Sequence, residues 1–284
     1  MAMLDWTQRM PELPEVETLR RGLQILTAGR TITHGRILVP KMVKGRVSDP
    51  QELARLLQGT QIKTIGRRGK NLLFTLDSGY HLLLHLKMRG QLLVVPSETA
   101  EAKYLAAALR LDNGQELRFH DMWTWGEMRL LSAQELASYP PLLMMGAEPL
   151  EPGWMPQDLA DALARRPKAM IKAALLNQAT LAGVGNIYAD ESLFRSRLQP
   201  TRPAGSLTRE EVDALHQAIR GVLSEATGGG GTTSDNYVDA EGAVGRYVPL
   251  VYDRGGEPCT ACAAPLTRTK VIGRGTVFCS RCQK

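Results

Sequence analysis

The residues of this chain with the clearest chemistry are its four cysteines, which all lie close to the C-terminus. They form two Cys-x2-Cys pairs separated by sixteen residues, Cys259 with Cys262 and Cys279 with Cys282. Two such pairs typically converge on one tetrahedral zinc ion. Four protein ligands leave the metal no open position for a substrate, so we predict one structural Zn2+ that holds a hairpin. Two disulfides or unpaired thiols are the alternatives, and a reducing compartment disfavours disulfides.

A second candidate is the nitrogen of a proline near the start of the chain. In the run Met10-Pro-Glu-Leu-Pro-Glu, Met10 can serve as the initiator, and methionine is normally removed before proline. Pro11 would then carry a free secondary amine, a nucleophile of the Schiff-base type, with a pKa of about 7.7 to 8 that leaves part of it unprotonated at neutral pH. Glu12 is adjacent and could act as a general acid. The alternative is an ordinary helix start, where acids favour the helix dipole.

Three polar side chains stand in glycine-containing turns where they could contact phosphate groups. Lys70 ends a Gly-Arg-Arg-Gly-Lys turn, Asn186 follows Gly-Val-Gly at the expected start of a helix, and Arg274 lies between two glycines in the cysteine hairpin. Helix N-termini and guanidinium groups both suit phosphate. The respective alternatives are a solvated turn, a helix cap and a solvated basic hairpin.

The composition is that of a folded chain with a bias toward polyanions. Its 284 residues are 43% hydrophobic and 23% charged, which excludes wholesale disorder and a small disulfide scaffold. Thirty-five Lys and Arg against 29 Asp and Glu give a net charge of +6, which favours nucleic acid as a partner without requiring it. No apolar run is long enough to span a bilayer and no secretory signal is recognisable, so we predict a cytoplasmic protein.

Two hydrophobic patterns divide the chain. A short amphipathic helix over 13–23, with Gly22 as its stop signal, precedes short apolar runs over 31–131 that predict an antiparallel β-sandwich or barrel. Helical spacing and glycine content then predict four helices, a mobile surface loop and a closing hairpin. The apolar runs are Ile62–Ile65, Leu72–Leu76, Leu82–Leu86, Leu92–Val95, Leu105–Leu111, Leu117–Phe119 and Met128–Leu131. The helices are 158–166, 168–178, 187–195 and 209–225, and the loop begins at glycines 228–231.

Six motifs, taken in order, resemble the formamidopyrimidine-DNA glycosylase family, which shares its fold with endonuclease VIII. Each motif is modest alone, but together they cover residues 10–284. They are Pro11-Glu-Leu-Pro-Glu-Val-Glu-Thr, Arg68-Gly-Lys, His85-Leu-Lys-Met-Arg-Gly, Gly183-Val-Gly-Asn-Ile-Tyr-Ala-Asp-Glu-Ser, Gly228-Gly-Gly-Gly-Thr-Thr and the cysteine pairs.

The resemblance implies an α+β protein with two domains. An N-terminal antiparallel β-sandwich flanked by helices would be followed by a helix-two-turns-helix domain with a four-cysteine zinc-finger hairpin. Residues 1–9 are expected to be absent from the active form, because an amide nitrogen at Pro11 has no nucleophilic lone pair. The implied boundaries are 10–140 for the catalytic sandwich, 141–157 for a linker, 158–246 for the helical domain, 228–247 for a loop that closes over the damaged base, and 247–284 for the zinc finger.

The resemblance also implies a monomeric, bifunctional DNA glycosylase and abasic-site lyase of base excision repair that acts on damaged double-stranded DNA. Its substrates would be oxidised purines, namely 8-oxoguanine and formamidopyrimidines. Pro11 would attack C1′ of the sugar to form an imine, and Glu12 would protonate the ring oxygen. Strand cleavage by β,δ-elimination would follow from the same amine.

Five further residues take DNA-contacting roles by motif match. Lys70, Asn186 and Arg274 would hold the phosphates around the extruded nucleotide, and Lys70 and Arg274 count with Pro11 and Glu12 as catalytic residues. Met88 matches the family's wedge methionine, which fills the gap left by the extruded base. Trp125 can stack there in place of the family's phenylalanine.

One segment departs from the family. Where the family has Asp-Pro-Arg-Arg-Phe-Gly, this chain has Asp121-Met-Trp-Thr-Trp-Gly. Thr124 stands for the arginine that reads the base opposite the lesion and cannot make a bidentate guanidinium contact, which leaves the opposite-base preference open. An oxidised-pyrimidine glycosylase like endonuclease VIII, and a silent binder of damaged DNA with a blocked amine, remain the alternatives.

Overall fold

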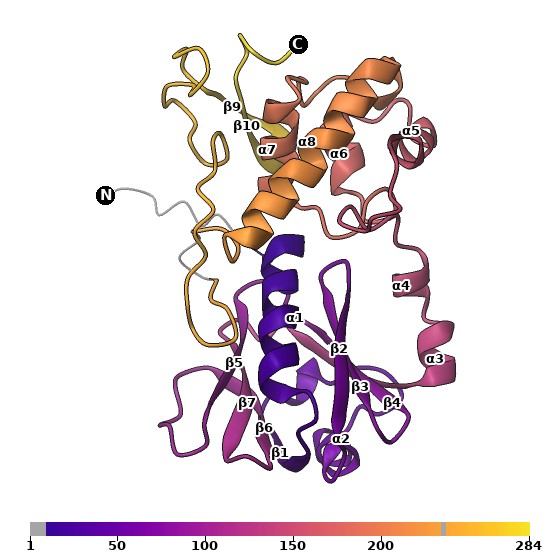
Figure 1. Ribbon diagram of the computed structural model, residues 1–284, viewed down its shortest axis with the longest axis vertical. Helices are drawn as coiled ribbons and strands as arrows, with labels where there is room; N and C mark the ends of the chain where they lie inside the picture. Colours follow the sequence, from indigo (N-terminus) through magenta and orange to yellow (C-terminus); the bar gives the residue numbers. More distant parts are fainter. Residues whose placement is uncertain (1–9, 234–236) are drawn as a thin grey trace. The chain divides into compact units, whose positions relative to one another are not determined.

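The computed structural model describes residues 10–233 and 237–284, and the chain divides into two compact units (Figure 1). One unit comprises the chain up to Tyr139 together with Thr233–Gly245, and we call it the sandwich unit. The other comprises Pro140–Thr232 and Arg246–Lys284, and we call it the helical unit. Among the described residues, no helix combines the length and the apolar character needed to cross a membrane.

The sandwich unit is built on two four-stranded antiparallel sheets, as the apolar runs predict. Each predicted run overlaps one strand, and a half-exposed strand of mixed composition, Ile32–Ile37, was not predicted. The strands are β1 (Ile32–Ile37), β2 (Ile62–Arg68), β3 (Asn71–Leu76), β4 (Tyr80–His85), β5 (Gly90–Pro96), β6 (Leu105–Leu111), β7 (Gln115–Asp121) and β8 (Glu127–Ser132). The sheet orders are β1-β6-β7-β5 and β2-β3-β4-β8.

Helix α1 (Leu13–Thr27) closes this unit's core, since it buries Val16, Leu19 and Leu23 among the side chains of both sheets. The prediction that Gly22 ends the helix is wrong, because α1 continues to Thr27. A Cβ at Gly22 would lie 3.1 Å from Cβ of Ala240, so the glycine permits close approach of a later segment. The smaller helices of the unit are η1 (Pro40–Met42), α2 (Pro50–Leu57) and α3 (Ala133–Ala137).

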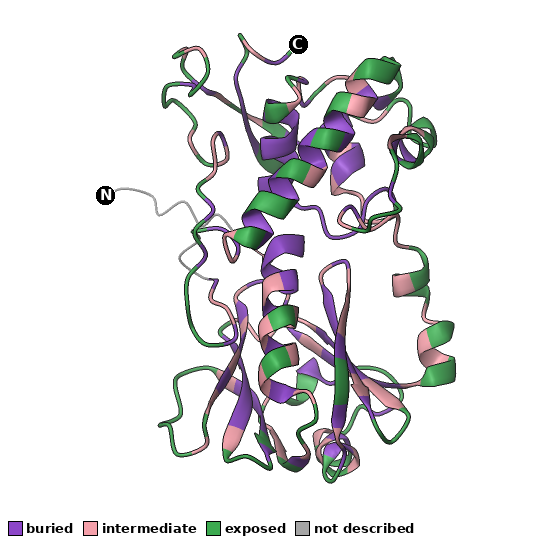
Figure 2. Ribbon diagram, in the orientation of Figure 1, coloured by how far each residue is buried: buried purple, intermediate pink, exposed green. Residues whose placement is uncertain are grey.

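The helical unit carries short helices around one long one. The longest, α8, has one buried and one exposed face (Figure 2) and starts at a capping box of Thr208 and Glu211. Its elements are α4 (Pro140–Leu143), α5 (Pro156–Ala164), α6 (Ile171–Leu176), α7 (Asn186–Arg195), η2 (Ala204–Ser206), α8 (Arg209–Gly228), β9 (Thr267–Val271) and β10 (Arg274–Phe278). The four predicted helices and the closing hairpin are all present.

The glycine-rich segment after α8 is a surface loop only in part, because residues 241–244 are exposed while residues near its middle are buried. Tyr237 and Ala240 are 4% and 1% exposed. The Tyr237 hydroxyl donates to the carbonyl of Glu15 at 3.0 Å, and the N–H of Val94 donates to the carbonyl of Ala240 at 2.8 Å. These contacts attach the middle of the segment to α1 and β5. Residues 234–236 of the predicted loop lie outside the described residues, as do residues 1–9.

Candidate active site and metal centre

Pro11 and Glu12 lie at the buried start of α1, where Glu12 is the N-cap residue and is 3% exposed. The N–H of Glu12 donates to the carboxylate of Glu15 at 2.9 Å, as in a capping box. Pro14, in the first turn, is already constrained to the helical φ. The capping hydrogen bond and Pro14 therefore define the start of the helix, where Pro11 and Glu12 are consecutive and both buried.

Lys70 lies in the turn between β2 and β3, where Gly69 has a φ of +55°. The next residue, Asn71, pairs with His85 on β4, so Lys70 stands close to that imidazole. Burial, together with the charges of Lys87 and Lys70, lowers the pKa of His85 to about 3. His85 is therefore neutral, and its Nδ1 accepts a hydrogen bond from the N–H of Lys87 at 2.9 Å.

Met88 lies in the turn that connects β4 of one sheet to β5 of the other. The residues on either side, Lys87 and Arg89, have φ of 51° and 65°, a region that residues with a Cβ rarely adopt. Gly90 is required here, because a Cβ would lie 2.3 Å from the carbonyl oxygen of Leu86. The side chain of Met88 is itself 8% exposed and thus buried.

Trp125 belongs to the loop between β7 and β8, which Asp121 holds from inside. One carboxylate oxygen of Asp121 accepts the N–H groups of Trp123 and Thr124 at 2.9 Å each, and the other accepts that of Gly126 at 2.6 Å. Thr124 has a φ of 56° and donates its hydroxyl to the carbonyl of Trp123. The loop displays the two indoles together, with ring centroids 4.9 Å apart and Trp125 50% exposed.

Asn186 and Arg274 are brought close together in the helical unit. Gly185 is the N-cap of α7, so the alternative of Asn186 as the cap is wrong, and its side-chain amide instead donates to the carbonyl of Gly275 at 3.0 Å. Arg274 is exposed and follows a two-residue turn in which Ile272 and Gly273 have φ of 45° and 77°. Two positive φ values at such a turn are those of a type I′ hairpin.

A buried ion pair behind this hairpin was missed by sequence reasoning. Lys172 and Asp190, with side chains 0% and 1% exposed, approach to 2.7 Å. The Lys172 ammonium also donates to the carbonyl of Gly275 at 2.9 Å, and Asp190 accepts the N–H of Val277 at 3.1 Å. The signal available was a lone lysine inside the apolar helical run Ile171–Leu176. The pair holds α6, α7 and β10 in register behind Arg274.

Glu191 is a second buried acid that the sequence did not single out. It is 1% exposed and accepts the backbone N–H groups of Leu250, Val251 and Tyr252 at 2.8 to 2.9 Å, together with the hydroxyl of Tyr247 at 3.1 Å. Four donors satisfy one carboxylate. Glu191 therefore anchors the segment 250–252, which leads into the cysteine hairpin, to α7.

The four cysteines meet at one point. All four sulfur atoms lie within 4.8 Å of one another, with Cys259 and Cys282 4.0 Å apart and Cys262 and Cys279 3.5 Å apart. A tetrahedral site with Zn–S bonds of about 2.3 Å requires sulfur separations of about 3.8 Å. The cluster thus fits one structural zinc ion and no disulfide is formed. The prediction of a four-cysteine zinc site is confirmed.

The predicted site residues fall into two groups, one in each unit. Those of the sandwich unit stand at element ends, and those of the helical unit stand around one metal-bound hairpin. The first group is Pro11, Glu12, Lys70, Met88 and Trp125, and the second is Asn186, Arg274 and the four cysteines. An antiparallel sandwich followed by a helical unit with a four-cysteine hairpin defines a class of zinc-finger proteins with a helix-two-turns-helix domain.

Family models identify that class more closely. The N-terminal domain of formamidopyrimidine-DNA glycosylase matches residues 10–128, its helix-two-turns-helix domain matches 145–237, and a zinc finger found in these enzymes and in isoleucyl-tRNA synthetases matches 256–284. The chain belongs to the formamidopyrimidine-DNA glycosylase family, a family of DNA glycosylases. The family resemblance and the fold class expected from the sequence are confirmed.

Individual relatives cover nearly the whole chain. The formamidopyrimidine-DNA glycosylase of Chloroflexus aurantiacus is 45% identical over 96% of this chain and 98% of its own length, and that of Geobacillus kaustophilus is 40% identical over 97% and 100%. Among solved structures, the enzyme of Thermus thermophilus is similar with a TM-score of 0.85 and 40% identity over 96% of this chain and 98% of that one. The Lactococcus lactis enzyme in complex with DNA containing an abasic site has a TM-score of 0.89 and 31% identity over 96% and 99%.

Proposed function

We propose that this protein is a bifunctional DNA glycosylase and abasic-site lyase that removes oxidised purines, 8-oxoguanine and formamidopyrimidines, from double-stranded DNA. The observation that carries the proposal is the buried, capped start of α1, where Pro11 and Glu12 are consecutive residues, so that removal of residues 1–10 would leave a secondary amine next to an acid. The relatives are bacterial formamidopyrimidine-DNA glycosylases that align over nearly the whole chain, and the Lactococcus lactis enzyme has been solved with DNA that contains formamidopyrimidine or an abasic site. We place its action on the bacterial chromosome, in the cytoplasm.

The chemistry begins at the Pro11 nitrogen, which must be a free secondary amine. This nitrogen forms a bond to C1′ of the sugar while the bond from C1′ to the base breaks, the base departs with the electron pair and takes up a proton, and the nitrogen, cationic after the attack, loses its own proton. Glu12 donates a proton to the ring oxygen as the ring opens, which leaves a cationic iminium at C1′. The iminium acidifies the C2′ proton, so its loss expels the 3′ phosphate, and a second elimination expels the 5′ phosphate.

The other site residues bind the DNA around the reacting nucleotide. In the proposal, Lys70, Asn186 and Arg274 hold phosphates, and the hairpin that carries Arg274 is fixed by the zinc ion and by the amide of Asn186. Met88 enters the stack where the base has left, which requires its side chain to leave its buried position. Trp125, already half exposed, stacks beside it.

Borohydride trapping tests the amine. A chain that starts at Pro11 and the chain with residues 1–9 attached are each incubated with duplex DNA that carries one 8-oxoguanine, and the imine is reduced to a stable cross-link. The expected result is a cross-link for the first form only. If neither form is trapped but both bind, oxidised purines are not the substrate, and a pyrimidine lesion in the same duplex then decides between an enzyme like endonuclease VIII and a silent binder.

Glu12→Gln tests the acid with a matched control. The variant retains the capping oxygen but cannot donate a carboxyl proton, so base excision should fall by about 100-fold while affinity for DNA with an abasic-site analogue is kept. The control is Glu52→Gln, which removes an exposed acid from the first turn of α2. Equal losses of excision in both variants would remove Glu12 from the reaction.

A further inference from the structure

The loop that carries Trp123 and Trp125 between β7 and β8 contains no Lys or Arg. The guanidinium of Arg89, in the turn between β4 and β5, lies against it. The Cζ atom of Arg89 lies 5.4 Å from the centroid of the Trp123 ring. This is within the distance of a cation–π contact, which Arg makes with its plane against the indole. The two turns are adjacent because Gly90 pairs with Asp121 across β5 and β7. Arg89, Trp123 and Trp125 thus form one cluster, in which the two indole planes are tilted by 57°, and we call it the arginine cluster.

The backbone on both sides of the arginine cluster is held by hydrogen bonds. Arg89 has a φ of 65° in a turn that the imidazole of His85 fixes by accepting the N–H of Lys87. Trp123 is fixed by the Asp121 carboxylate. A side chain with many rotamers, such as arginine, loses much less entropy on binding if it is already held against a ring. The arginine cluster is therefore suited to recognition of a planar group.

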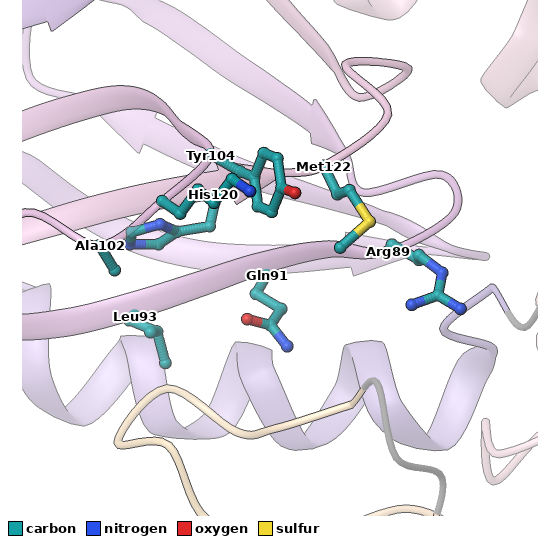
Figure 3. A pocket seen from close by; sticks show the side chains of 8 residues that line it. Arg89, Gln91, Leu93, Ala102, Tyr104, His120 and Met122 are labelled. Carbon is teal, nitrogen blue, oxygen red and sulfur yellow. The ribbon is translucent and has the colours of Figure 1, made fainter.

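The surroundings of Arg89 suit a nucleic-acid strand. Its side chain is partly exposed and, with Met122, lies at one end of a cavity of about 180 Å³ on the sandwich unit (Figure 3). Among the described residues, the cavity lining includes Lys103 and no Asp or Glu. A cationic, partly apolar surface beside an exposed indole, Trp125, and a half-buried one, Trp123, is the combination that binds a strand with unstacked bases.

We infer that Arg89 is the specificity-determining residue that reads the base opposite the extruded nucleotide, and that it selects cytosine. The inference rests on the proposed function for the presence of an unpaired base at this turn, next to Met88. A guanidinium edge offers two parallel N–H donors and no acceptor. The pairing edge of cytosine offers two adjacent acceptors, O2 and N3, whereas thymine places a donor at N3 and adenine and guanine each offer one acceptor on their pairing edge. Neither Trp123 nor Thr124 can supply such a contact.

The test measures binding, so that it does not depend on base excision. Affinities are determined for duplexes with a tetrahydrofuran abasic-site analogue opposite each of the four bases. The native protein should prefer cytosine over thymine by about tenfold, as expected of one bidentate contact. Arg89→Lys retains the charge but not the planar guanidinium, so it should lose most of the preference for cytosine while the salt dependence of DNA affinity changes little. Arg89→Ala should lose the preference and should also reduce the salt dependence of DNA affinity by about the amount expected for one cationic contact.

Arg110→Ala is the control, since Arg110 is an exposed cation on β6 of the same unit and its loss should leave the preference intact. The inference is overturned if the native protein binds all four duplexes equally, or if Arg89→Lys and Arg89→Ala retain the preference for cytosine. If no imine is trapped but the preference for cytosine still depends on Arg89, the proposed chemistry is rejected and this inference is kept. If the protein is trapped on 8-oxoguanine but its preference for cytosine does not change in the Arg89 variants, the proposed chemistry is kept and this inference is rejected.

Discussion

The sandwich unit and the helical unit fix their proposed DNA-contacting residues by different physical means. In the sandwich unit, Lys70, Met88 and Trp125 stand in turns at the ends of strands, above a large apolar core formed by both sheets and α1. In the helical unit, Arg274 stands on a two-stranded hairpin that shares only a small apolar cluster with α7, and a cysteine cluster and a buried ion pair also hold it.

This difference predicts which perturbations each half of the site can withstand. Apolar burial is spread over many side chains, so the turns of the sandwich unit should tolerate changes of pH and metal unless a titratable group is built into them. The hairpin has a much smaller apolar cluster and depends more on a few strong polar interactions, whose loss leaves charges or thiols buried without partners. The two halves can therefore be disabled separately.

Removal of the metal should have the largest effect. Structural zinc contributes on the order of 10 kcal/mol or more in small zinc-binding domains, so chelation or Cys279→Ser should unfold the β9–β10 hairpin and abolish its DNA contact. Hydrogen exchange followed by mass spectrometry should show lost protection in β9 and β10 and unchanged protection in β3 and β4. A hairpin that keeps its protection after the zinc content has fallen to zero would contradict the comparison.

Lys172→Met should have the next largest effect. It leaves the Asp190 carboxylate buried without its cation, which costs about 3 to 5 kcal/mol, and it frees the carbonyl of Gly275 behind Arg274. Denaturant unfolding measures the loss, and replacing Asp190 by leucine in the same chain should recover most of it. The control is Arg209→Met, which breaks an exposed pair with Asp213 and should cost less than about 1 kcal/mol.

The turn that carries Met88 should respond to pH through His85. Because its folded-state pKa is about 3 and lies below the ordinary value of 6.5, stability is constant above pH 6.5 and falls as the pH drops from 6.5 toward 3. The slope is about 1.4 kcal/mol per pH unit, or roughly 2 kcal/mol between pH 6.5 and pH 5. Urea unfolding followed by tryptophan fluorescence at pH 7, 6 and 5 measures it. His85→Gln, which cannot titrate, should lose less stability over that range, and parallel curves would exclude His85 as the source.

The smallest expected effect is a gain in stability at the hairpin tip. Ile272 is β-branched and 66% exposed, yet it has a φ of 45°, so Ile272→Asn should stabilise the protein by about 1 kcal/mol. The matched control is Val248→Asn, another exposed β-branched residue (67%) for which no positive φ is found. Thermal unfolding distinguishes the two, and an equal shift in both variants would mean that side-chain polarity rather than backbone strain is responsible.

Prediction from the sequence succeeded for features that depend on short-range spacing. The apolar runs of the sandwich, the helices at 158–225 and the two cysteine pairs all follow from repeats of two to four residues. It failed where a distant residue decides the outcome. Gly22 lies inside α1, where it makes room for Ala240, and contacts to Glu15 and Val94 bury Tyr237 and Ala240 of the glycine-rich segment.

The sequence by itself determined the fold class, the zinc site and the family, because period, turn residues and ligand spacing are local properties of the chain. Only the tertiary structure decided which side chains meet. Lys172 donates to the carbonyl of Gly275, which lies 103 residues further along the chain. Arg89 contacts Trp123 because β5 pairs with β7. Such contacts depend on strand register and on the direction of side chains across a sheet or helix, and a linear pattern does not contain either.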